Sequence, residues 1–151
     1  MKQFEDLYSE IQTDMIDICM EYVEDKAEKI FLYCSCEDNM IEGNVFYKIN
    51  GKVVMKHKLN EAVMGNQMYD VSISRQKEVI EVINDDIKKL MEVCKEYNQE
   101  MPTQIKIIYD IKMNSINAQA GYELYFSKSR KKTANDVFEK WFKEICKAEL
   151  N

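Results

Sequence analysis

The side chains that could catalyse a reaction are few, and they are spread along the sequence. His57 is the only histidine among the 151 residues, so a histidine-based metal site or acid–base pair would need cysteine or carboxylate partners. Cys34 and Cys36 lie two positions apart in a strand-like stretch, which places both thiols on one face of a sheet. We therefore consider one enzymatic arrangement, a thiol of Cys34 or Cys36 with His57. Core packing is the simpler explanation, because cysteine is among the most buried residue types.

Other motifs of enzymatic or metal chemistry are missing from the sequence. Cys19, Cys94 and Cys146 form no second C-x-C or C-x-x-C pair, so nothing indicates a zinc site. The chain has only four glycines and neither of the glycine-rich phosphate-binding motifs. Asp85 and Asp86 are neighbours on a predicted helix, where their side chains point about 100° apart, and we expect both to be solvated. The sequence therefore predicts no catalytic residue, no metal and no cofactor.

The remaining signal is a row of acidic residues near the N-terminus. Residues 1–30 contain nine acids and three bases, whereas the other 121 residues contain 18 of each sign. Apolar residues three and four apart over residues 4–22 predict an amphipathic helix, and the acids repeat with the same period on a displaced face, about one every 5.4 Å. The candidate partner-binding residues are Asp6, Glu10, Asp14, Asp17, Glu21, Glu24 and Glu28.

This acidic row has two interpretations. It is either a solvated helix face or a surface that occupies a basic groove on a partner, because basic side chains attract an ordered line of negative charge. An ordinary solvated face usually mixes both signs, and the excess of acids keeps the second interpretation open. The same charge disfavours direct binding to nucleic acid or to a membrane surface. A basic cluster at Lys128, Arg130, Lys131 and Lys132 is left without a predicted role.

Strands and two further helices must position these residues. Residues 30–36, 44–49 and 52–59 have the composition of three strands, and Asn50-Gly51 favours a type I′ hairpin turn between the last two. Ser72 or Ser74 begins a long helix that runs to about residue 97. The remaining expectations are a strand at 104–113, a loop at 114–121, a strand at 122–127 and a helix that begins after Thr133, which forms a capping box with Asp136.

The order of these elements predicts an α+β fold. We expect a single domain over residues 1–151, with an antiparallel sheet of about five strands covered by helices in the order α-β-β-β-α-β-β-α. No apolar run approaches the ~18–20 residues of a membrane span, and the N-terminus lacks the basic and apolar regions of a signal peptide. Five scattered cysteines do not suggest a disulfide framework, so we expect reduced thiols. Together these features predict a soluble, cytoplasmic protein.

Several stretches of the sequence resemble the YezG-like family of bacterial immunity proteins. The order of LYSEI with its acidic helix, EKIFLYCSCED, NVFYKING, TQIKIIYDIKM and GYELYF is similar to that family's layout over nearly the whole chain. Ala27 and Pro102 stand where the family usually has tryptophan. The resemblance implies a non-enzymatic, cytoplasmic antitoxin. Such a protein binds the C-terminal toxic domain of a secreted polymorphic toxin, often a nuclease exported by a type VII secretion system.

Two functional hypotheses follow. The first is an immunity protein that inhibits a cognate toxin domain, basic and nuclease-like, by protein–protein interaction. The alternative is a small cytoplasmic regulatory or adaptor domain that binds a peptide or a small ligand.

Overall fold

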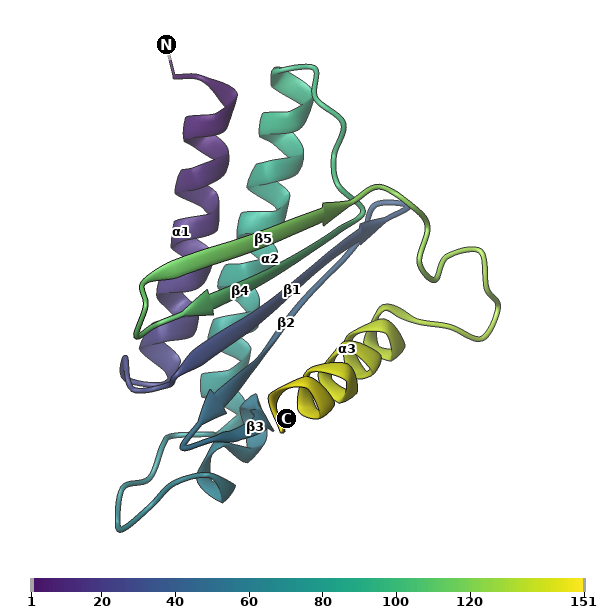
Figure 1. Cartoon of the computed structure of the whole chain (residues 1–151). Helices are drawn as coiled ribbons and strands as arrows, with labels where there is room; N and C mark the ends of the chain where they lie inside the picture. Colours follow the sequence, from purple (N-terminus) through teal and green to yellow (C-terminus); the bar gives the residue numbers. More distant parts are fainter. Residues whose placement is uncertain (1, 151) are drawn as a thin grey trace.

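An antiparallel sheet with helices on both faces forms the centre of the protein, which we describe over residues 2–150 from a computed structural model (Figure 1). The strand order is β3-β2-β1-β4-β5, and the predicted α+β order of helices and strands is confirmed. The elements are α1 (Phe4–Tyr22), β1 (Lys29–Glu37), β2 (Met40–Ile49), β3 (Lys52–Met55), the short 3₁₀ helix η1 (Lys56–Glu61), α2 (Ile73–Glu96), β4 (Gln104–Asp110), β5 (Ser115–Gly121) and α3 (Ala134–Glu149).

Two tight turns join the first three strands. Asn50 and Gly51 both have positive φ angles, 50° and 79°, as the predicted hairpin between β2 and β3 requires. Asp38 and Asn39 make the turn between β1 and β2 with φ angles of 52° and 62°. Because this turn is so short, β2 begins at Met40, and residues that we expected in a longer loop pair with β1 instead.

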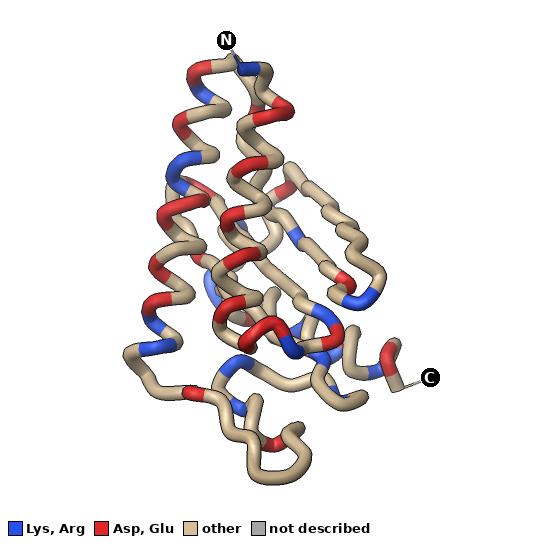
Figure 2. Tube along the Cα trace, turned by 90° about the vertical axis from the view of Figure 1, so that its left-hand side faces the viewer, with Lys and Arg blue, Asp and Glu red and all other residues tan. Residues whose placement is uncertain are grey.

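Helices α1 and α2 lie side by side on one face of the sheet (Figures 1 and 2). They run in opposite directions: the Phe4 ring, at the start of α1, lies 6.1 Å from that of Tyr97, which follows α2. Gly43 of β2 allows a close approach of α2, because a Cβ atom at this position would collide with the side chain of Ile83. The Tyr47 hydroxyl on β2 donates a hydrogen bond of 2.8 Å to the carbonyl oxygen of Cys19 on α1.

Helix α3 covers part of the opposite face and forms a second, aromatic core. The Phe31 and Phe46 rings stack at 4.7 Å, and Trp141 packs edge-on against Phe46 at 5.1 Å. At the C-terminal end of α3, Glu149 accepts hydrogen bonds from Lys29 at 2.8 Å and from Lys48 at 2.9 Å. These charged contacts fix the end of α3 to β1 and β2.

The second half of the chain differs most from expectation. The predicted loop at 114–121 is largely β5, whereas the predicted strand at 122–127 is irregular. This irregular segment is held by the carboxylate of Glu37, which accepts backbone hydrogen bonds from Tyr125, Phe126 and Ser127 at 2.9, 3.4 and 3.0 Å. Burial alone raises the pKa of Glu37, but the hydrogen bonds outweigh it and hold the pKa below its usual value.

Two other strands are shorter than predicted. The expected strand at 52–59 ends at Met55, and η1 follows, so His57 lies in a helical turn rather than a strand. The expected strand at 104–113 ends at Asp110. Over residues 2–150, no helix combines the length and apolar character needed to cross a bilayer.

Candidate functional site

The outward side of α1 carries a row of acidic residues. The helix contains six acidic residues and no basic one. Its apolar residues Ile11, Met15 and Cys19 are buried against the rest of the fold, which turns the carboxylates toward solvent. Figure 2 shows the row of acids along α1.

The seven predicted residues are all exposed, but they do not all lie on the helix. Asp6, Glu10, Asp14, Asp17 and Glu21 belong to α1. The expectation that the row continues in helical geometry to Glu24 and Glu28 is wrong. Glu24 and Asp25 have φ angles of 52° and 60°, a left-handed conformation that ends the helix after Tyr22. Glu28 lies before β1, where its carboxylate accepts a 2.6 Å hydrogen bond from the backbone of Gly51.

Several of these carboxylates have local partners. Glu10 pairs with Lys2 at 2.6 Å, and Glu21 lies 3.4 Å from a guanidinium nitrogen of Arg75. Asp6 accepts a 3.3 Å hydrogen bond from the backbone of Gln3, which caps α1. Within residues 2–150, Asp17 has no ion-pair or hydrogen-bond partner. Because exposed ion pairs are weak, these contacts leave most of the negative charge of α1 available to a partner.

Asp14 meets a buried carboxyl group on the neighbouring helix. Asp86 of α2 is only 1% exposed, so the expectation that it is solvated is wrong, although Asp85 is exposed as predicted. The pKa of Asp86 is raised to about 7, mainly by burial, and the neighbouring carboxylate of Asp14 contributes to this rise. The Lys89 ammonium lies 3.7 Å from a carboxylate oxygen of Asp86 and only partly offsets the rise in its pKa. Asp86 lies three residues after Ile83 and four before Leu90, a spacing that places it on the buried side of α2.

Helix α2 does not extend the acidic surface. It contains six acidic and five basic residues, and Figure 2 shows both signs along its length. The excess of acid in the helical layer therefore belongs to α1, as the sequence predicted. A partner that recognised this layer by charge would be oriented by α1 rather than by α2.

The proposed thiol–histidine arrangement is not assembled. Cys34 is buried beneath α1, where its Sγ atom lies 3.6 Å from Sδ of Met15, while His57 is exposed on η1. Burial raises the pKa of the Cys34 thiol to about 12 and also raises that of Cys36, the opposite of what a thiolate nucleophile needs. Among residues 2–150, no three histidine, cysteine or acidic side chains gather in a way that would hold a metal ion.

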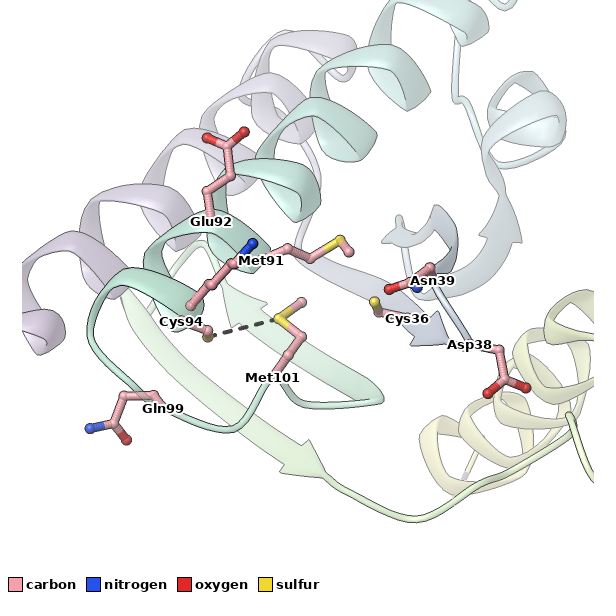
Figure 3. A pocket seen from close by; sticks show the side chains of 9 residues that line it. Cys36, Asp38, Asn39, Met91, Glu92, Cys94, Gln99 and Met101 are labelled. Carbon is pink, nitrogen blue, oxygen red and sulfur yellow. Dashed lines mark hydrogen bonds between the residues drawn. The ribbon is translucent and has the colours of Figure 1, made fainter.

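A pocket of about 560 Å³ lies between the C-terminal part of α2 and the turn after β1 (Figure 3). Sequence reasoning did not identify it, because its walls come from segments far apart in the chain. Sulfur atoms of Cys36, Met91, Cys94 and Met101 line it, and Cys94 Sγ lies 3.9 Å from Met101 Sδ. The Asp38 and Glu92 carboxylates point away from these sulfur atoms in Figure 3. The pocket wall near these sulfur atoms is therefore largely apolar, and Lys95 is the third charged residue of the lining.

The chain matches no protein-family model, and no curated protein is significantly similar to it in sequence.

Proposed function

We propose that this protein is an immunity protein that neutralises a cognate toxin domain by binding it through α1. The observation that carries the proposal is the negative charge of α1, which has six acidic residues and no basic one. The resemblance to YezG-like immunity proteins supports the same function, with a secreted nuclease as the cognate toxin and the cytoplasm as the place of action.

The proposed mechanism is occlusion of a basic groove. Nineteen helical residues span ~28 Å, so α1 is long enough to lie along a groove that accommodates nucleic acid. Its carboxylates would pair with the lysine and arginine side chains that otherwise bind phosphates. Inhibition then requires no chemical reaction by this protein. It requires only that the lifetime of the complex exceeds the time that free toxin needs to bind its substrate.

Rescue by co-expression tests this function directly. The C-terminal domain encoded by the neighbouring gene is expressed in a sensitive bacterium with and without this protein, and surviving colonies are counted. We expect rescue together with a complex that can be purified. A toxic neighbour that this protein neither rescues nor binds would contradict the proposal.

Charge reversal on α1 tests the surface. We expect Glu10→Lys combined with Asp17→Lys to slow association with that toxin domain by about tenfold or more at low salt, because electrostatic steering is lost. Stopped-flow or surface-binding kinetics at several salt concentrations measure the rate. The matched control is Glu139→Lys with Glu144→Lys on α3, two exposed positions across the sheet that change the net charge equally. Equal slowing by both pairs would remove α1 as the binding surface.

The pocket favours a second candidate function, an adaptor that binds a small apolar ligand or an apolar side chain of a peptide. A thermal-shift screen with small metabolites and short peptides would find such a ligand as a rise in Tm. We expect Cys36→Phe, which fills the pocket, to abolish the rise, whereas Asn135→Phe on the exposed side of α3 leaves it unchanged. A rise that survives Cys36→Phe would place the ligand elsewhere.

A further inference from the structure

We propose that the free edge of β5 pairs with β5 of a second copy of this chain, so that two sheets join into one antiparallel ten-stranded sheet. This inference concerns a surface on the sheet edge, away from the acidic row of α1, and it does not depend on the identity of a toxin.

The two edges of the sheet differ in how they are protected. At one edge, β3 has only four residues, begins with Lys52 and is followed at once by η1. At the other edge, β5 pairs with β4 over seven residues, from Ser115 to Gly121, and no strand within residues 2–150 pairs with its second side. The backbone N–H and C=O groups of alternate β5 residues point to that side, where they can pair with another strand.

Strand β5 lacks the features that normally prevent edge pairing. Its sequence, SINAQAG, contains no charged residue and no proline, and it pairs with β4 in a continuous register without a bulge. Six of its seven side chains are exposed, and Gly121 is partly so. Figure 2 shows the strand as an uncharged stretch at the side of the molecule, in a chain with 32% charged residues. A charged edge would meet the same charge in a second copy, whereas this neutral one does not.

The sequence of β5 is also self-complementary. In an antiparallel pair centred on Ala118, Ile116 of one copy faces Ala120 of the other, and Asn117 faces Gln119. Directly opposed residues share a face of the sheet, so this register matches apolar with apolar and amide with amide. Ala118 lies on the two-fold axis and faces its own counterpart.

Exposed apolar side chains gather around the same edge. Ile116 is 52% exposed, and Met113, Tyr122 and Leu124, on either side of the strand, are 72%, 50% and 43% exposed. Pairing through β5 would bring these side chains from both copies close to one seam, where some of their apolar surface can be removed from water.

Sedimentation equilibrium and native mass spectrometry of the full chain test the proposal. We expect the mass to approach twice 17.9 kDa as the protein concentration is raised to ~100 µM. We also expect added salt to strengthen the dimer, because each copy carries a net charge of −6. A single copy at every concentration would overturn the proposal.

Charge substitutions at the two-fold position make the test specific. Ala118→Lys and Ala118→Glu should each be monomeric, because each places like charges against one another, whereas an equal mixture of the two should form a heterodimer. Formation of the dimer in the mixture shows that neither variant is misfolded. Ala148→Lys, at an exposed position of α3, is the matched control and should still dimerise. Dimers of both single variants at the wild-type concentration would rule out β5 as the interface.

Discussion

The buried carboxyl of Asp86 makes the contact between α1 and α2 depend on pH. Its pKa is raised to about 7 by burial and by the adjacent Asp14, whereas in the unfolded chain it returns to about 3.8. Between these values the folded state holds a proton that the unfolded state releases. The contribution of Asp86 to stability is therefore present at acidic pH and lost as the pH rises toward 7.

Asp86→Asn should prevent this loss of stability at higher pH, because an amide stays neutral and can donate a hydrogen bond to Asp14 at every pH. We expect the variant to be more stable than the wild type at pH 8 by about 1–3 kcal/mol, with a much smaller difference at pH 5. Urea unfolding at the two pH values measures the free energies. Asp85→Asn, at the exposed neighbouring position, is the control and should show no such dependence. An equal effect of Asp86→Asn at both pH values would contradict the raised pKa of Asp86 in the folded state.

At the scale of elements, helices were more predictable than strands. The apolar periodicity over residues 4–22 matches α1. Thr133, and Ser72 of the two candidates Ser72 and Ser74, each accept a backbone hydrogen bond at the start of a helix. Helical periodicity and capping are local signals, which one segment of sequence contains in full. The end of the acidic row was missed, because the left-handed turn at Glu24 and Asp25 contains no glycine to mark it.

Strand β5 was missed because its pairing is not local. Serine, alanine, asparagine and glycine have low strand propensity, and only the register with β4 makes 115–121 a strand. The alternation of Tyr122, Leu124 and Phe126 suggested a strand one segment later. In the structure Phe126 enters the aromatic core under α3, and the backbone around it binds Glu37 rather than a neighbouring strand.

At the scale of the whole molecule, the two faces of the sheet have cores of unequal size. Among residues 2–150, the core beneath α1 and α2 contains 24 buried residues, and the one beneath α3 contains seven. The smaller core includes Trp141, the only tryptophan. The sequence predicted that helices cover the sheet, but not which helix covers which face. The assignment of helices to faces depends on how the connecting segments pass across the sheet.

This inequality predicts that α3 separates from the sheet before the rest unfolds. In urea, we expect the fluorescence of Trp141 to change at a lower concentration than most of the far-UV circular dichroism. Phe138→Ala should lower the fluorescence midpoint and leave the main circular dichroism midpoint nearly unchanged, whereas Ile83→Ala in the larger core should lower mainly the circular dichroism midpoint. Coincident transitions in the wild type would show that the two cores unfold together.

The turn between β2 and β3 also bears on the chemical lifetime of the protein. Asn-Gly sequences deamidate when the glycine nitrogen attacks the asparagine side chain, which adds a negative charge and can lengthen the backbone. Here the Gly51 N–H donates to Glu28 at 2.6 Å, and the Asn50 amide donates to the carbonyl of Ala62 at 2.8 Å. Both reacting groups are held in other hydrogen bonds, so the folded structure slows deamidation of Asn50. Deamidation can proceed faster whenever the protein unfolds.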